Sequence, residues 1–143
     1  MAIVSWLESV PAAQVALLMV SLQQIILGVG WVSAAALMGP HRAGAFWAGA
    51  YAFASGVSIG AFVIAIGFAQ EWLRPWGNVL ALVAMLCLHR AARAFIGLPP
   101  PRRAHAALLL LTVLVMGALW VVARQDPVRI ALAAGLVVAL ALW

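Results

Sequence analysis

The sequence predicts an all-α fold, a polytopic bundle of about five transmembrane helices in one domain over residues 1–143. Hydrophobic residues make up 68% of the chain and charged residues 8%, whereas a soluble domain carries about 25% charged residues. The apolar runs are continuous and rich in Ala and Leu, whereas membrane-spanning strands alternate apolar and polar residues. Because this composition cannot build a surface for water, the chain must use lipid as its solvent.

Two long uncharged runs open the chain. No charged side chain interrupts residues 9–40, and Pro11 suits the first turn of a helix, so we expect a helix over about 11–38. The next uncharged run predicts a second helix over about 43–69. Each is long enough to cross the hydrocarbon core.

Three further helices are expected after these. The third covers about 76–96 and ends at Gly97 and the proline run 99–101, because proline lacks an N–H and clashes with the preceding turn. The fourth covers about 104–123. The fifth covers about 127–143 and stops in mid-pattern, which agrees with a short helix ending at the interface or with the front part of a longer protein.

A basic stretch separates the third and fourth expected helices. All eight basic residues of the chain are Arg, and four of them lie here: Arg90, Arg93, Arg102 and Arg103. Each arginine would cost about 2.5–3.5 kcal/mol at mid-bilayer, so the stretch belongs at a membrane surface. We interpret it as a basic anchor that also touches anionic lipid headgroups; the alternative is a contact surface for a partner domain.

The arginines also predict an orientation in a bacterial inner membrane. With the basic stretch in the cytoplasm, Arg42 lies on the same side, which gives five arginines inside and three outside. The N-terminus is then outside and the C-terminus is cytoplasmic. The net charge of +5 does not indicate nucleic acid as a partner, because the arginines form no stripe along one polar face.

Three histidines, His41, His89 and His105, fall on this cytoplasmic side. Helix bundles build haem and metal sites from facing side chains, but this spacing matches no metal motif. His89 is expected about five residues deeper than its helix end, and His105 at a helix start, so we expect the two rings to be offset along the membrane normal. No metal, haem, quinone or other cofactor is predicted, and His89 and His105 are the candidates if one binds.

The first two expected helices contain a set of polar side chains and a set of glycines, and each set has two possible roles. The polar residues either bond helices together or line a pocket for a small ligand; they are Gln23, Gln24, Tyr51, Ser55 and Ser58. The glycines permit close helix approach, within one subunit in preference to a dimer seam; they are Gly49, Gly56 and Gly60.

No catalytic pattern is present, so we expect no enzymatic activity. The chain has no H-E-x-x-H, no G-x-S-x-G and no phosphate loop. Its acids, Glu8, Glu71 and Asp126, lie near expected helix ends on the predicted outer side. Without an intramembrane acid, a pump or an ion-coupled transporter is disfavoured.

Two stretches, HRAGAFWAGAYAFASGVSIGAF and NVLALVAMLCLHRAARAFIGLPPPRR, resemble the membrane sensor regions that precede bacterial GGDEF diguanylate cyclase domains. In the second stretch an Asn-led apolar helix exits through an Arg-x-x-Arg-x-Phe-x-Gly-x-Pro turn, here Asn78, Arg90, Arg93, Phe95, Gly97 and Pro99. The resemblance covers about residues 40–105. The GGDEF domain itself is absent from the chain, so no cyclase activity is carried over.

The resemblance implies a membrane input region that relays a signal through its last helix to a cytoplasmic effector. A different hypothesis is a small accessory or scaffolding subunit of a larger membrane complex. A haem- or quinone-binding module is a third. Lipid is the expected partner, and a homodimer or a larger assembly stays open.

Overall fold

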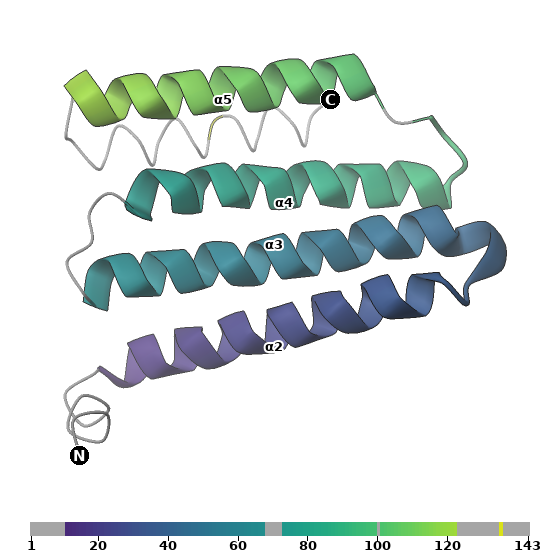
Figure 1. Ribbon diagram of the computed structural model, residues 1–143, viewed down its shortest axis with the longest axis horizontal. Coiled ribbons are helices and arrows are strands. Elements are labelled where there is room, and N and C mark those ends of the chain that lie inside the picture. The colour runs from purple at the N-terminus through teal and green to yellow at the C-terminus, as the bar shows by residue number, and fades with distance from the viewer. Residues whose placement is uncertain (1–10, 68–72, 100, 123–134, 136–143) are drawn as a thin grey trace.

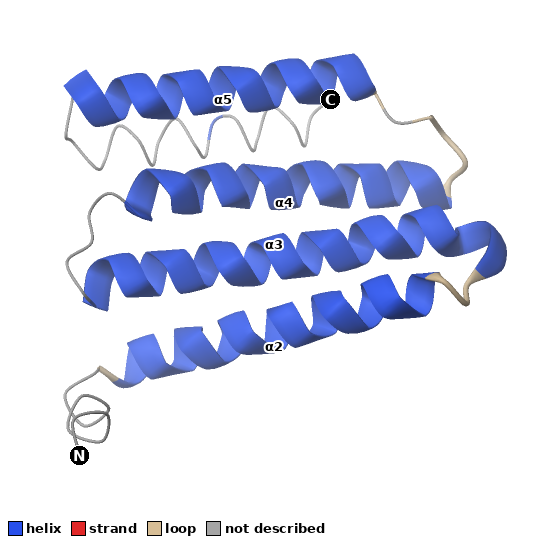
Figure 2. Ribbon diagram, viewed as in Figure 1, coloured by secondary structure: helices blue, strands red, loops and turns tan. Residues whose placement is uncertain are grey.

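The fold is all-helical, as predicted. A computed structural model describes residues 11–67, 73–99, 101–122 and 135, and this part of the chain contains helices and no strand (Figure 2). The elements are α2 (Ala12–Ala35), the 3-10 turn η1 (Gly39–His41), α3 (Arg42–Gly67), α4 (Leu73–Phe95) and α5 (Arg102–Val122).

The helices run up and down in chain order. Figure 1 shows α2, α3, α4 and α5 arranged side by side, and each packs against the one before it. Short connections force this antiparallel order, because a turn of a few residues can only return the chain beside the helix it left. The α2–α3 and α4–α5 connections therefore lie at one end of the bundle.

Three of these helices are long and apolar enough to cross a membrane. They are Ala12–Ala35, Gly39–Gly67 and Pro75–Phe95, judged by length and composition. α5 lies where the fourth helix was expected. The fifth expected helix, about 127–143, lies outside the described residues apart from Gly135, so five spans are not confirmed.

Small residues let α2 and α3 approach closely, and Gly49, Gly56 and Gly60 all face α2. A Cβ added at Gly49 would lie 2.8 Å from the carbonyl oxygen of Gly28, and one added at Gly56 would lie 2.7 Å from the carbonyl oxygen of Ser21. A backbone oxygen cannot move aside as a flexible side chain can. The glycines are therefore needed for packing within this chain.

Two hydroxyl groups tie neighbouring helices together at these contacts. Ser21 donates a 2.7 Å hydrogen bond to the carbonyl oxygen of Gly56, from α2 to α3. Ser58 donates a 2.8 Å hydrogen bond to the carbonyl oxygen of Gly77, from α3 to α4. Both serines are buried. Polar side chains in apolar surroundings need such partners, and here the partners are backbone carbonyls of the next helix.

Apolar side chains hold α4 to α5. Leu82 and Leu86 of α4 are buried and pack against Leu108 and Leu109 of α5. The fully buried positions of α5 recur at helical spacing on one face: His105, Thr112 and Met116. Of these three side chains only His105 is ionisable, and it lies in the first turn of α5, at the end of the bundle that carries the α4–α5 connection.

Candidate functional site

Arginine and histidine side chains gather at the end of the bundle that carries the α2–α3 and α4–α5 connections. We call it the basic end and define it by eight residues: His41, Arg42, His89, Arg90, Arg93, Arg102, Arg103 and His105. The rings of His41 and Phe95 lie 6.1 Å apart, which brings the two connections together. No Asp or Glu lies among the described residues, so none of these arginines is neutralised there.

A chain of hydrogen bonds joins α4 to α5 at this end. Nε of Arg90 donates to Nδ1 of His105 over 3.0 Å. Nε2 of His105 lies 2.9 Å from Nδ1 of His89. His105 is 2% exposed, whereas Arg90 and His89 are half-buried.

The donor and the acceptor in each of these hydrogen bonds can be assigned from Arg90. A guanidinium can only donate, so Nδ1 of His105 is the acceptor and, in a neutral ring, Nε2 carries the proton. Nε2 of His105 then donates to Nδ1 of His89, which must also be unprotonated. These hydrogen bonds can form only when both imidazoles are neutral. A proton on Nδ1 of His105 would face the N–H of Arg90, and a proton on Nδ1 of His89 would face the N–H of His105.

The two histidine rings are in contact, although an offset along the membrane normal was expected for them. Phe95 ends α4 and Arg102 starts α5, so His89 lies six residues and His105 three residues from the respective helix ends. The difference corresponds to about 4.5 Å along the bundle axis. Two imidazoles on facing helices can span that distance, and the ring centroids are 5.1 Å apart. The contact depends on how far the two side chains reach, which the spacing of the residues in the sequence does not show.

Trp47 adds a third helix to this cluster. The guanidinium carbon of Arg90 lies 4.7 Å from the centroid of the Trp47 ring, on α3. A cation over an aromatic face is attracted by the ring quadrupole, by about 0.5–2 kcal/mol depending on desolvation. Arg90 therefore contacts α3 and α5 from its place on α4. The sequence did not reveal Trp47 as a partner, because its pairing with Arg90 depends on the register between α3 and α4.

The α4–α5 turn is closed by a glycine C-cap. Gly97 has φ +75°, a left-handed conformation that glycine adopts without a Cβ penalty. The N–H of Leu98 bonds to the carbonyl of Arg93, and the N–H of Gly97 to that of Ala94, which is the Schellman pattern. Nε of Arg93 donates to the carbonyl oxygen of Pro99 over 3.0 Å. The side chain of Arg93 is thus fixed to the turn.

Arg102 and Arg103 stand apart from this network. Both are exposed in the first turn of α5, and within the described residues neither forms a hydrogen bond or an ion pair. The four arginines of the predicted basic anchor therefore fall into two pairs. Arg90 and Arg93 form hydrogen bonds through Nε, whereas Arg102 and Arg103 form none to the described part of the chain.

The residues of the expected ligand pocket are dispersed. Ser58 is buried and bonded to Gly77, whereas Gln24, Tyr51 and Ser55 are half-buried and Gln23 is exposed. Gln23 lines a shallow apolar hollow on the outer face of α2 with Met19, Leu22, Ile26 and Leu27.

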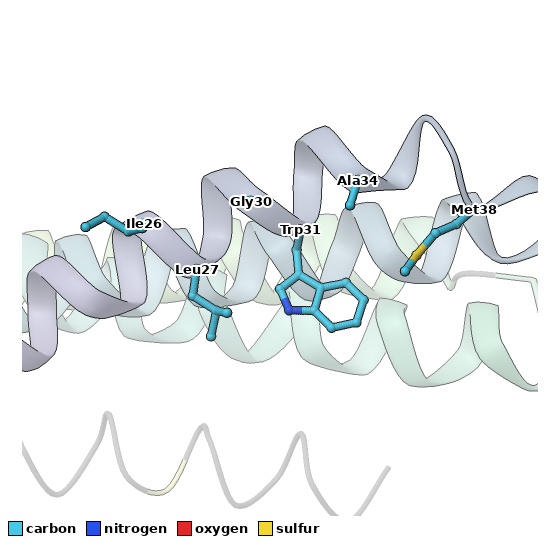
Figure 3. Close-up of a pocket in the computed structure, with 6 residues that line it drawn as sticks. All are labelled: Ile26, Leu27, Gly30, Trp31, Ala34 and Met38. Atoms are coloured by element: carbon cyan, nitrogen blue, oxygen red, sulfur yellow. The ribbon is translucent and has the colours of Figure 1, made fainter.

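A second hollow lies further along the same helix. Its lining comes from α2 and from Met38 just beyond the helix end, and Gly30 and Ala34 leave room between the larger side chains: Ile26, Leu27, Trp31 and Met38 (Figure 3). Apolar side chains around it are exposed, as expected of a helix face solvated by lipid. Neither hollow carries a charged residue.

The described residues contain no group of three or more His, Cys, Asp or Glu side chains able to hold a metal ion. Cys87 is a buried free thiol in α4. The chain was compared with known protein families, with curated proteins and with solved structures, and no match was found in any of the three comparisons.

Proposed function

We propose that the chain is a membrane-embedded sensory input region that relays a signal through its last helix to a cytoplasmic effector such as a diguanylate cyclase domain. The observation that supports this most is the position of Arg90. Its guanidinium lies over Trp47 of α3 and bonds to His105 of α5. A displacement of α5 relative to α3 and α4 must break or remake these contacts, so the cluster has the position a coupling element would need.

The resemblance to sensor regions in front of GGDEF domains supplies the effector class. The turn that carries the resemblance contains Arg90, Arg93 and Gly97, and the same residues build the hydrogen-bonded end of α4. The proposal includes a bacterial inner membrane with the basic end in the cytoplasm. In that orientation the C-terminus is on the side where cyclic dinucleotides are made.

The test uses the native gene product in its own membrane. Its reading frame is first followed past Trp143, and cyclic diguanylate is then measured in cells carrying the wild type, His105→Ala or Trp31→Leu. Trp31 is exposed on the outer face of α2, far in the sequence from the cluster, and serves as the matched control. We expect His105→Ala to change the cyclic diguanylate level at least about twofold, because it removes the bond that joins α4 to α5, and Trp31→Leu to leave it unchanged.

A second candidate function is a scaffolding subunit. The observation that favours it is the wide apolar outer face of α2, with Met19, Leu22 and Ile26 exposed. A reading frame that closes at Trp143, together with stoichiometric copurification of other membrane subunits, would favour this function over the sensor.

A further inference from the structure

The two internally bonded arginines of the basic end share one chemical feature. Arg90 and Arg93 each use Nε for a bond within the protein, to His105 and to Pro99. Within the described residues, the terminal nitrogens of both guanidinium groups form no hydrogen bond. Each guanidinium plane is therefore oriented by the protein while its two terminal nitrogens stay available as donors.

The two side chains also start from neighbouring positions on α4. Residues three apart in a helix are neighbours on the helix surface, about 5–6 Å between Cβ atoms. Arg90 and Arg93 are both half-buried, so much of the cost of ordering long side chains has already been met by the fold. Two oriented guanidinium groups on one face match the geometry of an anion with several oxygens, above all a phosphate.

The position of the pair selects the source of the phosphate. Arg90 lies five residues before the end of α4, about 7.5 Å along the axis, and Arg93 lies in the last turn. This is the depth at which arginines of a spanning helix reach the headgroup layer. Trp47 contacts Arg90 and Phe95 lies near His41, so two aromatic rings lie at the basic end, as aromatic residues do at a membrane interface.

The charges of the neighbourhood favour an anion as well. The partial positive charges of the α3 and α5 N-termini offset the partial negative charges of the α2 and α4 C-termini at this end, so the arginines themselves supply the positive charge, with no acid in the first turn of α3 or α5. No acidic side chain among the described residues competes for the guanidinium groups.

We propose that Arg90 and Arg93 form a binding site for the phosphate of one anionic phospholipid headgroup. The site depends on the orientation that the folded turn gives to the two guanidinium groups, and positive charge alone does not create it. Arg102 and Arg103 carry the same charge at the same end but are exposed and form no bond to any residue that the structure describes, so they lie outside it. This proposal does not depend on the sensor function.

The test compares lipid binding to the full chain in neutral detergent at about 0.15 M ionic strength, where exposed charges are largely screened. Native mass spectrometry reads out phosphatidylglycerol and phosphatidylcholine of matched acyl chains. We expect the wild type to retain one phosphatidylglycerol at least about tenfold more strongly than phosphatidylcholine, since hydrogen bonds between charged groups distinguish the two headgroups.

Matched double variants then locate the site. R90Q/R93Q should lower phosphatidylglycerol binding at least about tenfold, whereas R102Q/R103Q, which removes the same charge, should lower it less than about threefold. R93Q alone leaves the bond between Arg90 and His105 in place and should lower phosphatidylglycerol binding about fivefold. If circular dichroism shows that the R90Q/R93Q variant has lost helix content, the R93Q result is the test of the site. Equal losses in the two double variants, or unchanged binding in R93Q, overturn the proposal. Displacement of the lipid by equimolar inorganic phosphate would assign the site to a soluble anion and overturn the membrane source.

Discussion

His89 and His105 are joined ring to ring, with Nδ1 of one 2.9 Å from Nε2 of the other, although sixteen positions and a proline turn separate them in the chain. Arg90 bonds to the far side of the His105 ring. Polar groups at a helix interface are stabilising when each has its partner and costly when one is removed. Removing one member of this hydrogen-bonded series should therefore cost more than a single bond contributes.

His105→Ala should destabilise the protein by about 2–3 kcal/mol, because it leaves Arg90 without its acceptor and His89 without its ring partner at a buried position. Reversible unfolding by SDS in mixed micelles measures the loss. His41→Ala is the control, since the His41 ring is exposed and contacts Phe95 only at a centroid distance of 6.1 Å; it should cost less than about 0.5 kcal/mol. Equal losses in the two variants would show that the hydrogen-bonded chain does not stabilise the helix pair.

The same geometry predicts the protonation of both rings. Because Arg90 donates to Nδ1 of His105 and His105 donates to Nδ1 of His89, both imidazoles should be neutral with the proton on Nε2. Nitrogen-15 NMR of histidine-labelled protein at about pH 7.5, where a free imidazole is mainly neutral, distinguishes the tautomers. In the R90Q variant the tautomer of His105 should become mixed, since the donor that selects it is weakened. A signal from His105 protonated at Nδ1 in the wild type would contradict the assignment.

Cofactor binding gives a spectroscopic prediction for the same two residues. Two nitrogen ligands on opposite sides of a metal at about 2.0–2.1 Å each lie about 4 Å apart. The ring nitrogens of His89 and His105 are 2.9 Å apart and bonded to each other, and Arg90 occupies the other nitrogen of His105. The purified protein should therefore show no Soret band. A stoichiometric b-type spectrum that disappears in His89→Ala would overturn this.

Glycine packing between α2 and α3 predicts opposite effects at two positions. Gly49→Ala should destabilise by about 2–3 kcal/mol, because its Cβ would meet the carbonyl oxygen of Gly28 at 2.8 Å. Gly30→Ala is the control on α2, where a Cβ meets nothing within 4 Å, and it should stabilise by about 0.5–1 kcal/mol through the helix preference of alanine. SDS unfolding again reports both. A stable Gly49→Ala protein would mean that the helices separate without cost.

The helical class could be predicted from the few charges together with the continuous apolar runs, because this pattern favours spanning helices over spanning strands. The turn after α4 could be predicted too, since Gly97 and the prolines act locally. The start of α4 at Leu73 could not: a helix start at about residue 76 was expected, but Pro75 is tolerated inside the first turn of a helix.

The candidate site was harder to predict than the fold. The arginine cluster is visible in the sequence, but its division into an internally bonded pair and an exposed pair depends on which side chains reach across to α3 and α5. The contact between Arg90 and Trp47 and that between His89 and His105 are set by helix register. A single sequence carries no signal for register between helices when both faces are apolar.

The orientation of the bundle is the prediction on which the sensor proposal depends most. Five arginines are expected on the cytoplasmic side and three outside, and four of the five lie in the basic stretch. A periplasm-active phosphatase joined after Trp72 should therefore be active, and one joined after Pro100 should be silent. A fluorescent protein that matures only in the cytoplasm is the reciprocal control at Pro100.

Replacing the four arginines of the stretch with Ser should weaken or scramble this fusion pattern, since it removes most of the charge bias. An unchanged pattern would mean that other features set the orientation. An active phosphatase after Pro100 in the wild type would show that the bundle has the opposite orientation, with the basic end outside. The last helix would then not end in the cytoplasm, as a relay to a cytoplasmic effector requires.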